Sequence, residues 1–268
     1  MKPYEWPVCG RRVLQIANTS LEVEAIGPPP GSATTLILLH EGLGCVEMWR
    51  DFPMRLADLT GLGVLAYSRQ GYGQSAPCVL PRPLDYMERE AREVLPSVLD
   101  AMGIEQAVLI GHSDGASIAA LHQREAPDSR IIGLVLMAPH FFVEDLSIES
   151  IANARVAWRE TDLSKRLGRY HANVENAFQG WNDAWLDPGF RDWDISDSID
   201  HFGVPCLALQ GRQDEYGTAR QIEIITERSS ASVLTELLDE CGHAPFKDQP
   251  EAVLARIQTF VGSLKANA

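Results

Sequence analysis

The sequence lacks the features that would carry a chain into or across a membrane. No apolar run reaches the roughly 18–20 residues that a bilayer-spanning helix requires. Residues 1–10 show no basic stretch followed by an apolar segment, as a secretory signal would. We therefore expect a cytoplasmic protein that has no membrane partner.

Cysteine and positive charge are also scarce. The five cysteines are odd in number and lack the spacing of metal ligands, so we expect reduced thiols. They are Cys9, Cys45, Cys78, Cys206 and Cys241. Lysine and arginine total 23 against 37 acidic residues, which gives a net charge of -14. Because a phosphate backbone is bound by clustered cations, this composition argues against nucleic acid and anionic lipid as partners.

The length and composition are those of a globular protein with a large core. The chain has 268 residues, of which 45% are apolar and 22% charged, so it can bury a core of ordinary size without a disulfide framework. Both a monomer and a homodimer are compatible with these values.

Short apolar strands and amphipathic helices alternate through most of the chain. A hairpin is expected at 13–26, followed by an apolar run at 35–39 that predicts a strand buried on both faces of a parallel sheet. Further strands are expected at 63–67, 107–111, 131–138, 206–210 and 233–238, and helices at 46–59, 84–102, 115–125, 218–228 and 250–261. Such repeated units predict an α/β fold, with a mostly parallel central sheet flanked by helices. Ligands of these sheets bind beyond the carboxyl ends of the strands.

Residues 140–201 interrupt this alternation. They hold four of the six tryptophans, and two helices are expected there, at 148–160 and 163–180. An insertion between two core strands at their carboxyl edge would cover the sheet. We therefore predict a helical cap over a core formed by residues 1–139 and 202–268.

Gly111-His-Ser-Asp-Gly115 fits the pattern G-x-S-x-G between a predicted strand and a predicted helix. At such a reversal the central residue takes a strained backbone conformation, and the glycines leave room for the close approach. The Ser113 hydroxyl then projects at a helix N-terminus, where backbone N–H groups favour developing negative charge. Ser113 is thus the candidate nucleophile. The alternative is a glycine-rich turn with a capping serine.

A serine nucleophile needs a base, which in turn needs a carboxylate to orient it. Among the seven histidines, His243 follows the last predicted strand and so shares the carboxyl edge with Ser113. His140, which borders the interruption, is the one serious rival. Asp214 follows another strand at the same edge. We prefer it to Glu215 because adjacent loop residues point in different directions.

These motifs resemble those of the α/β-hydrolase superfamily, and of its capped esterases, lactonases and C–C hydrolases in particular. The resemblance extends over nearly the whole chain, and its order of Ser, Asp and His is that of the superfamily's catalytic triad. It also includes the stretches Leu39-His-Glu-Gly-Leu-Gly44, Ser68-Arg-Gln-Gly-Tyr-Gly-Gln-Ser75, Gly242-His243 and Asp248-Gln-Pro-Glu251. The resemblance implies that backbone N–H groups of Gly42 and Asp114 form an oxyanion hole.

Five residues are candidates for a substrate pocket: Glu41, His140, Trp158, Trp181 and Trp185. The tryptophans belong to the aromatic interruption, most of whose rings are expected to pack on the core. Glu41 departs from the family pattern, in which glycine follows the histidine. It either points outward or contacts substrate, in which case it would disfavour a substrate carboxylate nearby.

The resemblance and these residues together predict a serine hydrolase that needs no metal or organic cofactor and acts on a small acyl compound. Ser113 would attack a carbonyl, and water would then hydrolyse the acyl-enzyme. A small carboxylic ester or lactone is the favoured substrate. A C–C hydrolase of aromatic-ring catabolism and an acyl thioesterase are the alternatives. A cofactor-independent oxygenase and a non-catalytic hydrolase-fold receptor are more distant ones. The nucleophile position holds a serine, Ser113, and not an aspartate, which argues against haloalkane or epoxide chemistry.

Overall fold

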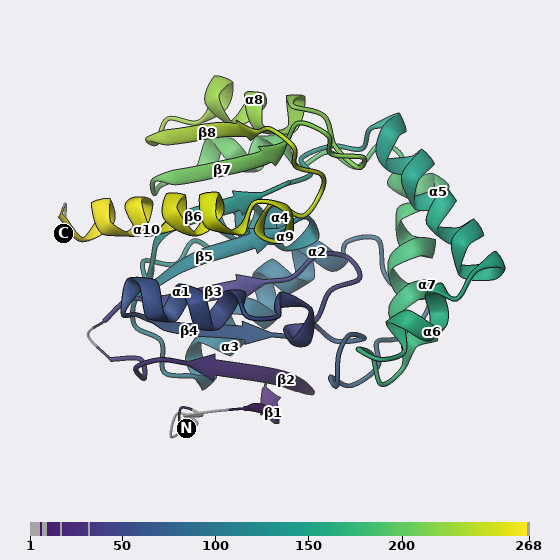
Figure 1. Cartoon of the computed structure of the whole chain (residues 1–268), viewed down its shortest axis with the longest axis horizontal. Coiled ribbons are helices and arrows are strands. Elements are labelled where there is room, and N and C mark those ends of the chain that lie inside the picture. Colours follow the sequence, from purple (N-terminus) through teal and green to yellow (C-terminus); the bar gives the residue numbers. More distant parts are fainter. Residues whose placement is uncertain (1–5, 7–9, 17, 32, 267–268) are drawn as a thin grey trace.

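A computed structural model describes residue 6 and residues 10–16, 18–31 and 33–266. Cys9 and most of the segment inspected for a secretory signal lie outside the described residues. The described chain is organised around one sheet of eight strands in the order β1-β2-β4-β3-β5-β6-β7-β8 (Figure 1). The strands are β1 (Arg11–Ile16), β2 (Thr19–Ile26), β3 (Thr35–Leu39), β4 (Gly63–Tyr67), β5 (Ala107–His112), β6 (Ile131–Met137), β7 (Cys206–Gly211) and β8 (Val233–Leu238).

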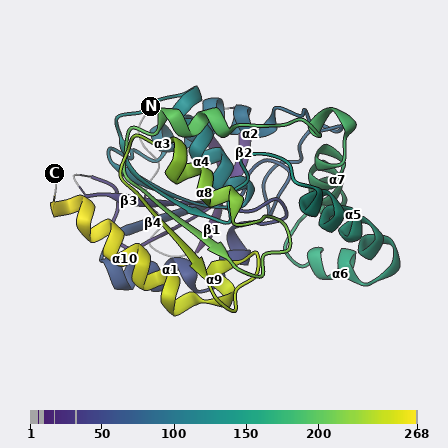
Figure 2. The same ribbon diagram turned by 90° about the horizontal axis from the view of Figure 1, so that it is seen from above.

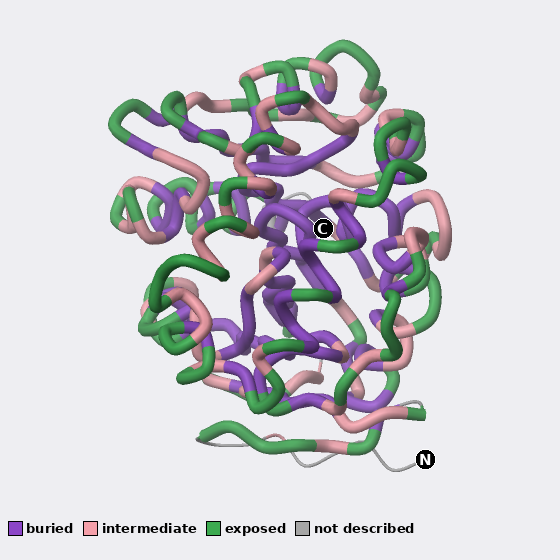
Figure 3. The backbone as a smooth tube through the Cα atoms, turned by 90° about the vertical axis from the view of Figure 1, so that its right-hand side faces the viewer, coloured by how far each residue is buried: buried purple, intermediate pink, exposed green. Residues whose placement is uncertain are grey.

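The sheet is parallel from β4 to β8, and the hairpin β1–β2 adds an antiparallel edge. Every residue of β3, β4, β5 and β7 is buried, as expected for strands covered on both faces (Figure 3). Helices lie on both faces, with α1 (Phe52–Thr60) and α10 (Pro250–Ala266) on one and α3 (Leu95–Ala101), α4 (Asp114–Glu125) and α8 (Arg220–Arg228) on the other (Figure 2). The predicted α/β fold is confirmed.

Two of the predicted core helices are divided. The segment 46–59 contains a 3-10 helix, Val46–Trp49, and then α1, because Arg50 between them has a positive φ of 56° that no helix accommodates. The segment 84–102 is a succession of α2 (Tyr86–Arg89), a π-helical turn (Glu90–Val94) and α3. Pro96 lies two residues after the end of that turn and supplies no backbone N–H, which disturbs the regular hydrogen bonding of a helix.

Three α-helices lie between β6 and β7 in the chain: α5 (Asp145–Glu160), α6 (Leu163–Leu167) and α7 (Val174–Trp185). They lie together beyond one end of the strands (Figure 1). The single helix predicted at 163–180 is wrong, because the side chain of Asn173 accepts a hydrogen bond from the Asn176 N–H and begins a new helix. Among the described residues, no helix is long and apolar enough to cross a bilayer.

Candidate active site

Ser113 occupies the turn between β5 and α4 with a φ of 53°, a region that residues with a Cβ rarely adopt. No side chain larger than that of glycine fits at the neighbouring positions 111 and 115. A Cβ at Gly111 would lie 2.3 Å from the Gly115 carbonyl oxygen, and one at Gly115 would lie 2.0 Å from the Leu39 carbonyl oxygen. The sequence motif therefore adopts the tight strand–turn–helix geometry that its glycines predict.

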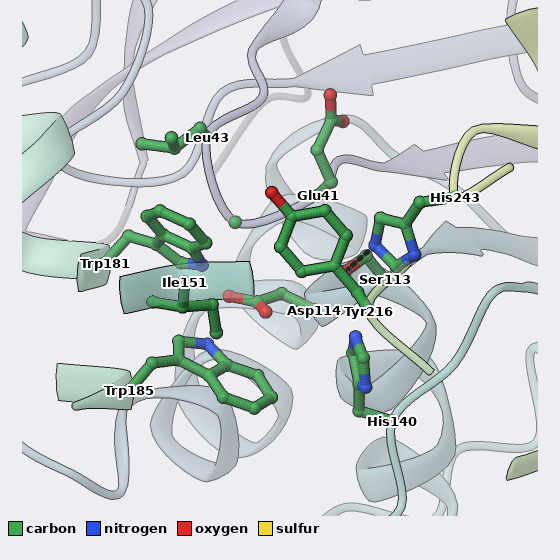
Figure 4. Close-up of a pocket in the computed structure, with 11 residues that line it drawn as sticks. Glu41, Leu43, Ser113, Asp114, His140, Ile151, Trp181, Trp185, Tyr216 and His243 are labelled. Atoms are coloured by element: carbon green, nitrogen blue, oxygen red, sulfur yellow. Dashed lines mark hydrogen bonds between the residues drawn. The ribbon is translucent and has the colours of Figure 1, made fainter. Parts of the chain in front are cut away.

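The structure brings Ser113, His243 and Asp214 together. His243 Nε2 lies 2.9 Å from Ser113 Oγ (Figure 4), and His243 Nδ1 lies 2.9 Å from both carboxylate oxygens of Asp214. One tautomer satisfies both contacts: Nδ1–H donates to the carboxylate, and Nε2 accepts from the serine hydroxyl. This is the arrangement that general-base activation of a hydroxyl requires.

Asp214 is held by donors on both of its oxygens. Oδ2 accepts from Gln210 Nε2 at 2.6 Å, and Oδ1 accepts from the backbone N–H of Tyr216 at 2.8 Å. Burial alone would raise the pKa of this carboxyl, but the hydrogen bond and charge of His243 lower it overall. Glu215 is exposed, and no hydrogen bond joins it to His243. Of the two adjacent acids, Asp214 is the one that contacts the imidazole.

Two further histidines border the triad. His112 donates through Nε2 to the His243 carbonyl oxygen at 2.6 Å, which ties the His243 loop to β5. The ring of His140 lies 5.5 Å from that of His243, between centroids, and makes no hydrogen bond to Ser113. Burial, together with the neighbouring imidazoles, lowers the pKa of His140 to about 3, although Asp214 opposes this shift. His140 is therefore neutral near pH 7. It is not in position to act as the base, because His243 is the imidazole that contacts the Ser113 hydroxyl.

Gly42 and Asp114 border the same cavity as Ser113. Asp114 is the first residue of α4, where a backbone N–H has no acceptor within the helix. Gly42 lies in a turn closed by a hydrogen bond from the Gly44 N–H to the Glu41 carbonyl oxygen at 3.0 Å. A Cβ at Gly42 would lie only 2.2 Å from Trp181 Nε1, so the tryptophan ring packs where only glycine fits.

A cavity of about 120 Å³ opens at Ser113. Its walls are mostly aromatic and apolar, and the described residues that line it include no lysine or arginine. They are Glu41, Gly42, Leu43, Ser113, Asp114, His140, Ile151, Trp181, Trp185, Tyr216 and His243 (Figure 4). Leu43, Ile151 and Tyr216 were not among the residues predicted to line the pocket. Tyr216 could have been suspected because it follows Asp214 by two residues, but nothing in the sequence distinguishes Ile151 from the other apolar residues of α5.

Of the three candidate tryptophans, Trp181 and Trp185 line the cavity and Trp158 does not. Trp158 stacks instead on Phe178, with ring centroids 4.1 Å apart and planes 12° apart. The expectation that Trp158 forms part of the pocket is therefore wrong. A flat indole on the outer helix α5 gains more contact from a parallel ring on α7 than from a small cavity.

Glu41 turns its side chain away from Ser113 (Figure 4). Its carboxylate oxygens lie 3.4 Å from His112 Nδ1 and 3.5 Å from Lys247 Nζ. Burial would raise the pKa of Glu41, but the charge of Lys247 and the adjacent His112 ring hold it well below its ordinary value. The charge of Glu41 is therefore directed toward Lys247.

Among the described residues, no group of three or more His, Cys, Asp or Glu side chains is arranged to hold a metal ion.

The sequence matches the family described as "Alpha/beta hydrolase family" over residues 36–256. Among curated proteins, it is 32% identical over 126 residues to epoxide hydrolase B of Mycobacterium tuberculosis, a match that covers 46% of this chain and 34% of that protein. It is 27% identical over 145 residues to the human (lyso)-N-acylphosphatidylethanolamine lipase, covering 54% of this chain and 41% of that enzyme. The matched segments thus span well under half the length of these relatives.

Solved structures resemble the whole chain. A proline iminopeptidase from Mycobacterium smegmatis superposes with a TM-score of 0.74 at 18% identity, covering 96% of this chain and 99% of that one. Naproxen esterase from Bacillus subtilis gives a TM-score of 0.73 at 19% identity, with coverages of 96% and 93%. At these identities the likeness establishes a shared fold, and specificity has to be argued from the site itself.

Proposed function

Because this chain belongs to the α/β-hydrolase family, we propose that it is a serine hydrolase that cleaves a small carboxylic ester or lactone. The observation that supports the proposal most strongly is the continuous hydrogen-bonded chain from Ser113 Oγ through His243 to Asp214, in which each contact measures 2.9 Å. It gives the serine hydroxyl both a base and a group that orients the base.

The proposed reaction has two halves. Ser113 Oγ attacks the substrate carbonyl carbon while His243 Nε2 takes its proton and Asp214 stabilises the imidazolium. The backbone N–H groups of Gly42 and Asp114 stabilise the oxyanion. The imidazolium then protonates the leaving alkoxide. In the second half, His243 deprotonates a water that attacks the acyl-enzyme, and Ser113 recovers the proton when the acid departs.

The cavity supports a small acyl group. A cavity of 150 Å³ in another protein accommodates benzene, so the 120 Å³ beside Ser113 suits an acyl chain of about six non-hydrogen atoms. In this proposal residues 140–201 act as a cap, with Ile151, Trp181 and Trp185 closing the acyl side of the site over the core formed by residues 1–139 and 202–268.

Some of the relatives are named epoxide hydrolases, which suggests epoxide opening as a second candidate reaction. Opening an epoxide through an alkyl-enzyme ester would require a carboxylate in the nucleophile position, and here the hydroxyl of Ser113 lies against His243. The carboxylate of Asp114, the residue that follows the nucleophile, accepts a hydrogen bond from Tyr86 instead. We therefore favour acyl transfer. A substrate panel containing thioesters and ring-fission products distinguishes esters from the other acyl substrates.

Covalent labelling tests the proposal directly. A fluorophosphonate probe should add to Ser113, identified by peptide mass spectrometry, and the enzyme should hydrolyse p-nitrophenyl esters of short acids. Ser113→Ala should abolish labelling and reduce kcat/KM by roughly 10⁴-fold or more. Ser97→Ala is the matched control, because Ser97 is half-buried outside the cavity and its hydroxyl donates to the Glu93 carbonyl oxygen. Retention of a tenth of the activity in Ser113→Ala would refute the mechanism.

A further inference from the structure

The side chain of Asp114, next to the nucleophile, has no role in the proposed mechanism, which uses only its backbone. The side chain is 1% exposed and borders the cavity. In Figure 4 the carboxylate points away from Ser113, toward the part of the cavity walled by Trp181 and Trp185. A buried carboxylate in the wall of an acyl pocket is costly unless something binds it.

One oxygen of this carboxylate is fully engaged. Oδ2 accepts a hydrogen bond from the Tyr86 hydroxyl at 2.5 Å and lies 3.8 Å from Arg69 Nη2. The Tyr86 oxygen in turn accepts from Trp185 Nε1 at 3.0 Å. Because the indole can only donate, the Tyr86 proton is committed to Asp114. This fixes the orientation of the carboxylate.

The other oxygen, Oδ1, is buried and has no hydrogen-bond partner among the described groups. A carboxylate oxygen left without a donor carries the full penalty of its desolvation. No lysine or arginine among the described residues lines the cavity to supply one. A donor carried by the molecule that fills the cavity would complete the set around this carboxylate.

The surroundings decide what kind of donor fits. Arg69, which is 2% exposed, already balances the charge of Asp114, so a neutral hydroxyl is sufficient. An ammonium is also accommodated, because the faces of Trp181, Trp185 and Tyr216 can stabilise a cation. A carbonyl or carboxylate at this point would bring one acceptor against another and would be disfavoured.

We infer that Asp114 is a specificity determinant, which selects esters whose acyl chain carries a hydrogen-bond donor, a hydroxyl or an ammonium group. This inference rests on the proposed function, since the donor is delivered on the acyl group that Ser113 attacks. It assigns the buried carboxylate to substrate recognition, whereas the triad performs the chemistry.

Binding to Ser113→Ala protein tests the inference without requiring turnover. The ligands are phenyl butanoate and its 3-hydroxy, 3-amino and 3-oxo analogues, and their binding is followed by quenching of tryptophan fluorescence, with calorimetry as a second readout. The 3-hydroxy or 3-amino ester should bind roughly 10- to 100-fold more tightly than the unsubstituted ester. The 3-oxo ester should bind no better than the unsubstituted one. The relative strength of the hydroxyl and amino arms identifies which donor the site takes.

Asp114→Asn in the same background should reverse the preference. Tyr86 and Arg69 would hold the amide oxygen in the place of Oδ2, so the amide N–H would face the cavity and favour the 3-oxo ester over the 3-hydroxy ester. Asp145→Asn is the matched control. Asp145 is exposed at the start of α5, and its carboxylate pairs with Arg191. It should leave the order of ligands unchanged.

The outcomes separate the two proposals. Equal binding of the unsubstituted, hydroxy and amino esters to Ser113→Ala protein would overturn the role of Asp114, whatever Asp114→Asn does and whether or not that variant folds. Selective donor binding, together with no ester turnover and no labelling of Ser113 in the wild type, would retain the recognition role and reject the serine hydrolase mechanism.

Discussion

The two sides of the cavity are built in different ways. On the side of the sheet, Ser113, Asp214 and His243 follow parallel strands, and hydrogen bonds between 2.6 and 2.9 Å fix their polar atoms. On the side of α5 and α7, Trp181 and Trp185 are held mainly by ring packing, with only the Trp185 indole N–H bonded to a protein group.

This difference predicts how each side affects catalysis. Hydrogen bonds are directional and lose their strength within a fraction of an ångström, so the sheet side fixes the reacting atoms. Apolar contact is nondirectional, so in the proposed reaction the side of α5 and α7 would set the size of the acyl group. Changes on the sheet side should lower kcat for every substrate, whereas changes on the side of α5 and α7 should alter KM and substrate preference.

The largest effect that tests this difference is expected at Asp214. Asp214→Asn keeps the shape but replaces an acceptor of the His243 Nδ1–H by an amide that can stabilise the wrong tautomer. We expect kcat to fall by roughly 10³- to 10⁴-fold near neutral pH, as in the triad template. Glu215→Gln is the adjacent control and should stay within about threefold of wild type, because Glu215 is exposed. The reverse ranking would assign the acid to Glu215.

The sheet side was also the more predictable from sequence. Continuous apolar runs placed β3, β5 and β7, and the glycines around Ser113 placed the turn, because both signals are local and come from backbone geometry. The acid and base then followed from one rule, that the carboxyl ends of parallel strands share an edge. These signals do not depend on how distant side chains pack.

The side of α5 and α7 depends on contacts between residues that are distant in sequence. Trp158 and Trp181 are chemically equivalent in the sequence, and only their packing on Phe178 and Gly42 separates them. The division of the predicted helix at 163–180 depended on one capping side chain, that of Asn173. The direction of Glu41 depended on Lys247, about 200 residues later in the chain. Local patterns contain none of this information.

Gly42→Ala sharpens the comparison where the two sides meet. The added Cβ would lie 2.2 Å from Trp181 Nε1, so either α7 or the turn that contains Gly42 must move. We expect kcat/KM to fall by roughly 10- to 100-fold, since a displaced donor stabilises the transition state poorly. Trp181→Phe should restore part of the loss in a double-mutant cycle. Gly203→Ala, where a Cβ meets nothing within 4 Å, is the control. Additive effects of the two changes would show that the contact is not shared.

A smaller effect is expected to distinguish Trp158 on α5 from Trp181 on α7. Trp181→Phe enlarges the cavity and should raise KM for short acyl esters by roughly 3- to 10-fold with kcat nearly unchanged. Trp158→Phe preserves a ring against Phe178 outside the cavity and should change kcat/KM by less than about twofold. Kinetics on acetyl, butanoyl and hexanoyl esters provide the measurement. An equal loss of activity in both variants would mean that α5 and α7 act on the site only as a packed unit.

The smallest effect is expected at Glu41, which lies beside the nucleophile but faces Lys247. Glu41→Gln should change kcat/KM by less than about threefold on both phenyl butanoate and the anionic phenyl hydrogen glutarate. A tenfold gain on the anionic ester alone would instead show that Glu41 repels carboxylates within the cavity.

The effect of Glu41→Gln on the free energy of unfolding should depend on pH. The pKa of Glu41 is held well below its ordinary value of 4.5, so the carboxylate stabilises the fold above that pH and loses this contribution as the pH falls further. Glu41→Gln should therefore lower the free energy of unfolding at pH 7 by about 1 kcal/mol. In urea titrations the difference from wild type should shrink toward pH 3, and a constant difference at both pH values would exclude the Lys247 pairing as its cause.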